Sequence, residues 1–85
     1  MKELTEHQRQ ILRDMDVYGM TIIQSLWYDQ RKCRMMASYR THCIDVRFDG
    51  DAVLPSTVRA LRDAGKIKFQ DVGIMSYYYL ARPDK

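Results

Sequence analysis

The chain has 85 residues, of which 46% are hydrophobic and 29% are charged, as in globular rather than disordered proteins. This length predicts one domain over residues 1–85, with a modest core and no deep active-site cleft. The apolar stretches are much shorter than the ~20 residues that cross a bilayer, and the polar N-terminus has no signal-peptide core. We therefore expect a cytoplasmic protein that does not bind membranes.

The formal charge of +3 is less informative than the distribution of its 14 cations and 11 acidic residues. Between positions 31 and 47 the only acidic residue is Asp45. The cations in that segment are Arg31, Lys32, Arg34, Arg40 and Arg47. A local basic zone on a nearly neutral body is compatible with nucleic acid, although a solvated face without a partner is the commoner reason for such a run.

Cysteine and histidine do not form a recognisable catalytic or metal site. Cys33 and Cys43 lack the Cys-x(2–4)-Cys spacing that structural zinc sites usually include. The sequence around His7 and His42 shows no recognisable combination of a nucleophile, a base and an acid that orients the base. We expect no metal, no cofactor and no enzymatic activity.

The first predicted element is a helix over residues 5–17. Thr5 and Gln8 form a capping-box pattern at its start, and Gly19 stands where helices usually end. The apolar side chains recur at helical spacing and predict a core-facing stripe that includes Leu4, Ile11, Leu12, Met15 and Tyr18.

Residues 20–48 change to the pattern of β-strands, with a polar break at 29–32 and a turn signal at Asp49 and Gly50. A hairpin, alone or with a third short strand, fits this region. A short helix around residues 35–37 is an alternative that the sequence leaves open.

The alternation at the end of this region predicts which side chains are buried. Ile44, Val46 and Phe48 share one face and are expected in the core, which leaves Arg47 in solvent. Arg40 is then on the core side and has to leave it at a bulge, an edge or a bend.

A second helix is predicted over residues 55–64, because Pro55 suits the first turn and Gly65 follows the last. Its apolar stripe consists of Leu54, Val58 and Leu61, with Thr57 at the edge. We expect this stripe to pack against the first helix. Residues 66–81 then read as a C-terminal hairpin.

Residues 54–67, with the sequence LPSTVRALRDAGKI, resemble the recognition helix and the start of the wing in winged helix-turn-helix domains. The shared features are Thr57, Val58, Leu61, and Gly65 before an apolar Ile67. The resemblance covers about a third of the chain and departs from the family at 20–48, where the family has a second helix. A small bacterial variant with strands in that place, similar to the YjhX-type proteins, fits the length.

The resemblance implies a small winged-helix-like α+β domain that consists of an N-terminal helix, a central hairpin, a recognition-type helix and a C-terminal hairpin wing. In such domains the recognition helix enters the major groove of double-stranded DNA and the wing lies along the phosphates. The residues that would contact DNA are Ser56, Arg59, Ala60, Arg62, Lys66 and Lys68, with Arg31, Lys32, Arg34 and Arg47 as further phosphate contacts. The carboxylate of Asp63 on the same face would repel phosphate, unless it pairs with Arg59 or accepts a hydrogen bond from cytosine. The implied function is that of a transcriptional regulator from a phage or other mobile element, or from a bacterial operon.

Two alternatives remain at this point. A protein-binding inhibitor or adaptor of the same fold would suit the modest net charge, with Trp27 or Tyr28 as its anchor. Residues 77–79, three consecutive tyrosines, could stack on single-stranded bases, although strand alternation places at least one of them in the core. The sequence leaves open whether the chain is a monomer or a homodimer.

Overall fold

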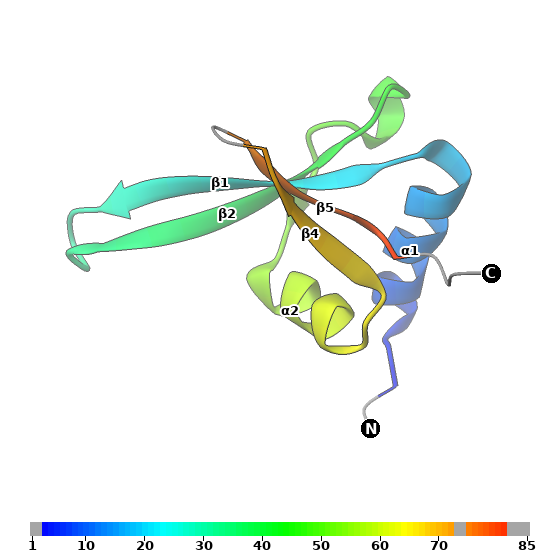
Figure 1. The fold of residues 1–85 in the computed structure, drawn as a ribbon, viewed down its shortest axis with the longest axis horizontal. Helices are drawn as coiled ribbons and strands as arrows, with labels where there is room; N and C mark the ends of the chain where they lie inside the picture. Colours follow the sequence, from blue (N-terminus) through cyan, green and yellow to red (C-terminus); the bar gives the residue numbers. More distant parts are fainter. Residues whose placement is uncertain (1–2, 73–74, 82–85) are drawn as a thin grey trace.

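A computed structural model describes residues 3–72 and 75–81 (Figure 1). Along these residues the elements are α1 (Glu6–Tyr18), β1 (Thr21–Asp29), β2 (Arg34–His42), η1 (Val46–Phe48), β3 (Ala52–Val53), α2 (Pro55–Asp63), β4 (Ile67–Asp71) and β5 (Ser76–Leu80). The five strands form one antiparallel sheet in the order β3-β2-β1-β5-β4. The chain is therefore a small α+β domain, as the sequence predicts.

Helix α1 begins and ends where its capping residues indicate. The Gln8 backbone N–H donates to the Thr5 hydroxyl at 3.1 Å, and the Thr5 N–H donates to the Gln8 side-chain oxygen at 3.0 Å. Gly19 ends the helix with a φ of 69°, a left-handed conformation that glycine adopts without strain. Ile11 and Met15 are buried, so the predicted helix and the centre of its stripe are confirmed.

One core cluster joins both helices to one face of the sheet. Its buried side chains are Ile11 and Met15 from α1, Val58 and Leu61 from α2, Ile22, Val53, Ile67 and Tyr78 from the strands, and Met20 and Cys43. Across the sheet, Ile22 pairs with Thr41 on one side and with Tyr78 on the other, so these three side chains lie on the same face. Of the helices in the described ranges, neither packs on the opposite face, which we call the open face.

The predicted core face of residues 44–48 is wrong for Ile44 and Val46, whereas Phe48 is partly buried against the core. Strand β2 ends at His42, and the side chain of Ile44 is 98% exposed while that of Val46 is 84% exposed. The core face of β2 is instead the one that carries buried Thr41, which leaves Arg40 on the open face. Arg40 therefore reaches solvent from a regular strand.

Hydrogen bonds to Thr41 explain why the strand stops. Its backbone N–H donates to the Asp51 carbonyl and its carbonyl accepts from Gly50 N–H, both at 2.8 Å. Its hydroxyl donates to the Phe48 carbonyl and accepts from Asp51 N–H. These bonds fold residues 43–51 back on the end of β2. Phe48 then stacks on Tyr18, with ring centroids 4.3 Å apart, and is only partly buried.

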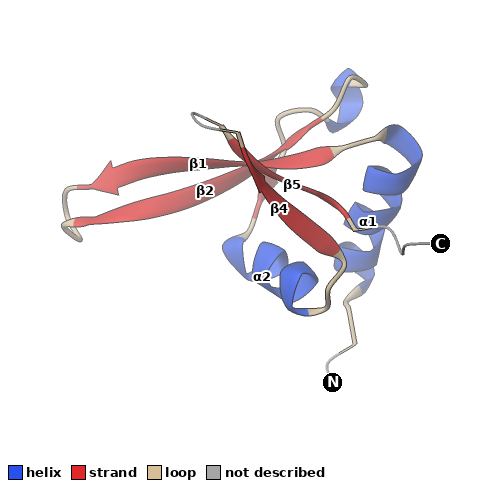
Figure 2. Cartoon of the chain, viewed as in Figure 1, coloured by secondary structure: helices blue, strands red, loops and turns tan. Residues whose placement is uncertain are grey.

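Strands β1 and β2 pair along their whole length, but the neighbouring strands β5 and β3 pair with only a short part of each. β5 pairs only with residues 22–24 of β1, and β3 only with residues 39–40 of β2. The two-stranded part, residues 25–38, extends beyond the rest of the sheet (Figures 1 and 2). We call it the arm. The alternative of a short helix around 35–37 is excluded, because these residues are in β2.

Helix α2 occupies the predicted range to within one residue, but its buried stripe is shifted. Thr57, Val58 and Leu61 are buried. Leu54, which the pattern placed in the stripe, is exposed because it precedes the first turn as the N-cap residue. β4 and β5 form the predicted C-terminal hairpin, in which Tyr78 is the buried tyrosine. The loop residues 73–74 of this hairpin lie outside the described residues.

Candidate nucleic-acid interface

The outer side of α2 is the surface that the winged-helix resemblance selects. Ser56, Arg59, Arg62 and Asp63 are exposed there, and Ala60 is half-buried. The carboxylate of Asp63 is 3.8 Å from Nε of Arg62, on a solvent-exposed pair that contributes little to stability. Within residues 3–72 and 75–81, Arg59 has no ion-pair partner. Pairing with Arg59, one of the two conditions under which Asp63 would not repel phosphate, is therefore absent from the described residues.

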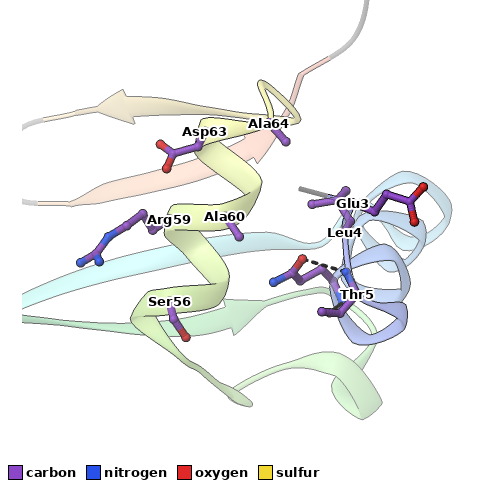
Figure 3. Close-up of a pocket in the computed structure, with 9 residues that line it drawn as sticks. Glu3, Leu4, Thr5, Ser56, Arg59, Ala60, Asp63 and Ala64 are labelled. Atoms are coloured by element: carbon purple, nitrogen blue, oxygen red, sulfur yellow. Dashed lines mark hydrogen bonds between the residues drawn. The ribbon is translucent and has the colours of Figure 1, made fainter. Parts of the chain in front are cut away.

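A groove of about 580 Å³ separates α2 from the beginning of α1 (Figure 3). Its lining residues are Glu3, Leu4, Thr5, Gln8, Ser56, Arg59, Ala60, Asp63 and Ala64. Ala60 and Ala64 point toward α1, whereas Arg59 points away from it. The lining has no cysteine, histidine or lysine. The carboxylates of Glu3 and Asp63 make the groove itself unfavourable for phosphate.

The predicted DNA contacts on the C-terminal hairpin are divided between two surfaces. Lys66, just before β4, is exposed, and its carbonyl accepts from Ala81 N–H at 2.9 Å. Lys68 is also exposed, but it alternates with buried Ile67 and so lies on the open face, away from the helices. Lys68 is therefore not part of the α2 surface.

The basic zone of residues 31–47 is likewise not one surface. Arg31 and Lys32 are exposed in the turn at the end of the arm, where both backbone N–H groups donate to Asp29 Oδ1. Arg34 is opposite Asp29 in the strand register at the same end of the arm, and its side chain belongs to the open face. Arg40, which is nearer the body of the domain, belongs to the same face. The turn brings the three terminal cations of the arm together.

Arg47 is separate from the other cations. It lies in η1, near α1 and far from the end of the arm (Figure 1). Its guanidinium contacts both carboxylate oxygens of Asp45, at 2.7 and 3.1 Å, and lies over the ring of Phe48. The hydrogen bonds lower the pKa of Asp45 and raise that of Arg47. Arg47 is thus paired, and we remove it from the candidate interface.

The two candidate protein anchors are on opposite sides of the arm. Trp27 pairs with Met36 on the open face and is 46% exposed. Tyr28 pairs with Met35 on the other side, and both are exposed, as is Leu26. The arm therefore presents apolar side chains to solvent on both of its sides, which is unusual for a surface without a partner.

The open face is the surface that sequence reasoning did not identify as a unit. Tyr77 and Tyr79 lie on it because they alternate with buried Tyr78. Pairing across the sheet adds Ile23 and Arg40 to the same row as Tyr77. The sequence alternation around Tyr78 could have shown that Tyr77 and Tyr79 share a face. The strand order, which places β5 beside β1, could not be predicted from the sequence.

Other classes of site find no support in the described part of the chain. No group of three or more His, Cys, Asp and Glu side chains there is arranged to hold a metal ion. Cys33 is exposed at the end of the arm and Cys43 is buried, so they do not form a pair. None of the helices found in the described ranges is long and apolar enough to span a membrane.

Comparison with known proteins gives no family model, no curated protein and no solved structure that matches this chain.

Proposed function

We propose that this protein binds double-stranded DNA through the outer side of α2. The observation that supports the proposal is that one side of α2 is buried in the core while its arginines are exposed on the other. Val58 and Leu61 fix one side of α2 in the core, while Arg59 and Arg62 extend into solvent. A rigid helix with two solvent-exposed guanidinium groups suits insertion into a major groove, because arginine can donate two parallel bonds to guanine. The exposed pair of Arg62 with Asp63 is weak.

The chain order around α2 supports the same proposal. Gly65 follows the helix with a φ of 72°, and β4 and β5 come directly after it as a hairpin in the position of a wing. The hairpin of β1 and β2 takes the place of the second helix that winged-helix domains normally have. In this proposal Lys66 contacts phosphates beside the groove, Arg31 and Lys32 at the end of the arm contact phosphates farther along the duplex, and the protein acts as a small transcriptional regulator.

The test is fluorescence anisotropy with a duplex selected from a random pool, repeated across a salt series. Arg59→Ala should weaken binding to the selected duplex by about 1–3 kcal/mol and relax its sequence preference. Arg62→Ala should weaken binding to all duplexes and lower the salt slope by about one unit. Arg13→Ala, which removes an exposed arginine from α1, is the matched control. If both α2 variants bind duplexes as the Arg13 variant does, α2 is not the DNA-binding element.

A protein-binding function is the second candidate, favoured by the exposed apolar side chains of the arm. Trp27 on one side of the arm, or Leu26, Tyr28 and Met35 on the other, would anchor a larger complex or a second copy of the chain. In that case Trp27→Ala or Tyr28→Ala should abolish self-association in sedimentation velocity with little dependence on salt, and Arg59→Ala should not. A monomer at every concentration would argue against the homodimer.

A further inference from the structure

The open face carries two tyrosine rings at its centre. Tyr77 pairs with Ile23 on β1 and with Gln70 on β4, and Tyr79 pairs with Lys68. The ring centroids of the two tyrosines are 6.3 Å apart and their planes are inclined by 55°. Tyr79 is 36% exposed and Tyr77 is half-buried, so both rings are accessible from solvent.

A third ring lies on the same face farther along β1. Trp27 is two alternations beyond Ile23, at roughly 13 Å for a strand rise of about 3.3 Å per residue. Ile23 is itself beside Tyr77 in the register. The three rings therefore lie along a path that runs from β5 out along the arm.

The charged side chains of this face are almost all cations. Those of the described strands are Arg34, Arg40 and Lys68, against a single carboxylate, Asp29. Asp29 is at the end of the arm, where it accepts two backbone N–H groups. His42 lies 3.2 Å from Asp49 and is not counted as free. Arg40 and Lys68 thus flank the tyrosines with no carboxylate from the same face between them.

Exposed aromatic rings with cations on both sides suit single-stranded nucleic acid better than a duplex. In a duplex the bases stack on one another and cannot lie on a protein ring, whereas unpaired bases stack on aromatic side chains with little sequence preference. Cations on both sides of the rings would contact the phosphates of the same strand.

We propose that the open face binds single-stranded nucleic acid. Bases stack on Tyr77, Tyr79 and Trp27, while Arg40 and Lys68 contact the backbone. This site is on the opposite side of the sheet from α2, so it goes beyond the proposed duplex site and does not depend on it.

The experiment uses the fluorescence of Trp27, which is the only tryptophan of the chain. Titration of the intact protein with unlabelled dT and rU dodecamers should quench this fluorescence, after correction for absorbance with free N-acetyltryptophanamide. A blunt duplex of the same length should quench it much less. Absence of quenching by both dodecamers, together with no binding of labelled dodecamers in anisotropy, overturns the proposal.

Variants then test which side chains are used. Tyr77→Leu and Tyr79→Leu should each weaken dodecamer binding by about 5- to 150-fold, while Tyr79→Phe, which keeps the ring, should retain it. Tyr28→Leu removes an exposed tyrosine from the other side of the sheet and is the matched control. Arg40→Ala and Lys68→Ala should each lower the salt slope by about 0.7 units.

The folded state of each variant is checked first by circular dichroism and thermal melting. If the Tyr77 and Tyr79 variants are folded and bind the dodecamer as the Tyr28 variant does, the open face is not the site. Loss of self-association in these variants, with no dodecamer binding by the wild type, would assign the face to a protein partner and overturn the proposal. Arg59→Ala should leave dodecamer binding unchanged, so this result and the duplex result can fail separately.

Discussion

The hydroxyl of Thr41 should contribute about 2 kcal/mol to the free energy of unfolding. The side chain is 8% exposed, and its oxygen donates to the Phe48 carbonyl and accepts from Asp51 N–H. Thr41→Val keeps the shape and the β-branched character but removes both bonds. Each bond contributes ~1 kcal/mol net, and two backbone groups lose a partner in a partly buried position.

This loss is large for so short a chain. At 0.05–0.15 kcal/mol per residue, a domain of 85 residues has a total stability of about 4–13 kcal/mol. A destabilisation of ~1 kcal/mol lowers the Tm of a domain of this size by about 4–8 °C, so we expect a decrease of about 8–16 °C for Thr41→Val. The measurement is urea denaturation with thermal melting, and amide exchange at Asp51 should become faster.

Thr41→Ser is the matched control, because it keeps the hydroxyl and removes only a methyl group, at a cost of ~0.8 kcal/mol. The expected order of stability is therefore wild type, then the Ser variant, then the Val variant. A Val variant as stable as the wild type would refute the argument that the hydroxyl holds residues 43–51 on the end of β2.

Two further predictions concern the core and the Asp45–Arg47 pair. Leu61 is fully buried, so Leu61→Ala should lower the free energy of unfolding by about 2–5 kcal/mol, and an unchanged denaturation midpoint would contradict its place in the core. Because Arg47 lowers the pKa of Asp45 in the folded chain, their pairing stabilises the fold above the unfolded-state pKa of Asp45 and loses this effect as the pH falls through its folded-state pKa. Arg47→Ala should raise the pKa of Asp45 toward its ordinary range in an NMR titration of the carboxyl carbon, but only in part, because the backbone N–H of residue 47 still donates to Asp45 Oδ1. An unshifted titration would show that the side-chain pair does not form in solution.

Elements whose ends carry a local chemical signal were predictable from the sequence. Thr5, Gln8 and Gly19 determine α1 through hydrogen bonds and a left-handed φ that depend only on neighbouring residues. Pro55 in the first turn and Gly65, with a φ of 72°, likewise mark the ends of α2 without a side-chain cap. Period-two alternation was sufficient for the C-terminal hairpin, in which Ile67 and Tyr78 are buried on one side.

Ile44 and Val46 were mispredicted because their alternation is that of a strand, but no strand forms there to turn them toward the core. Ile44 and Val46 are apolar at strand spacing, yet the chain has already left the sheet at His42. What ends the strand is the set of bonds between Thr41 and residues 48–51, and the partners of a hydroxyl do not appear in a hydrophobicity pattern. The placement of Arg40 on the core side followed from the same error.

The candidate site was predictable on α2 and unpredictable elsewhere. Helical periodicity is enough to place Arg59 and Arg62 in solvent. The basic zone, in contrast, divides among the end of the arm, the open face and η1, because a hairpin separates residues that are close in sequence. The pairing of Arg47 with Asp45 and the apposition of Tyr77 with Ile23 both require the fold.

The strand order has a consequence for how the chain folds during synthesis. β1 is the central strand, and its two neighbours are β2, which follows immediately, and β5, which is the last strand in the described chain. The β1–β2 hairpin can therefore close while later residues are still being made, since its loop is short. Tyr78 reaches Ile22 only after α2 and β4 have been synthesised, and such long-range pairing is slow. Until then residues 22–24 of β1, at the base of the arm, have no strand on the side where β5 will pair. The nascent chain therefore passes through a state with an unpaired, apolar strand edge, which can misassociate until β5 docks.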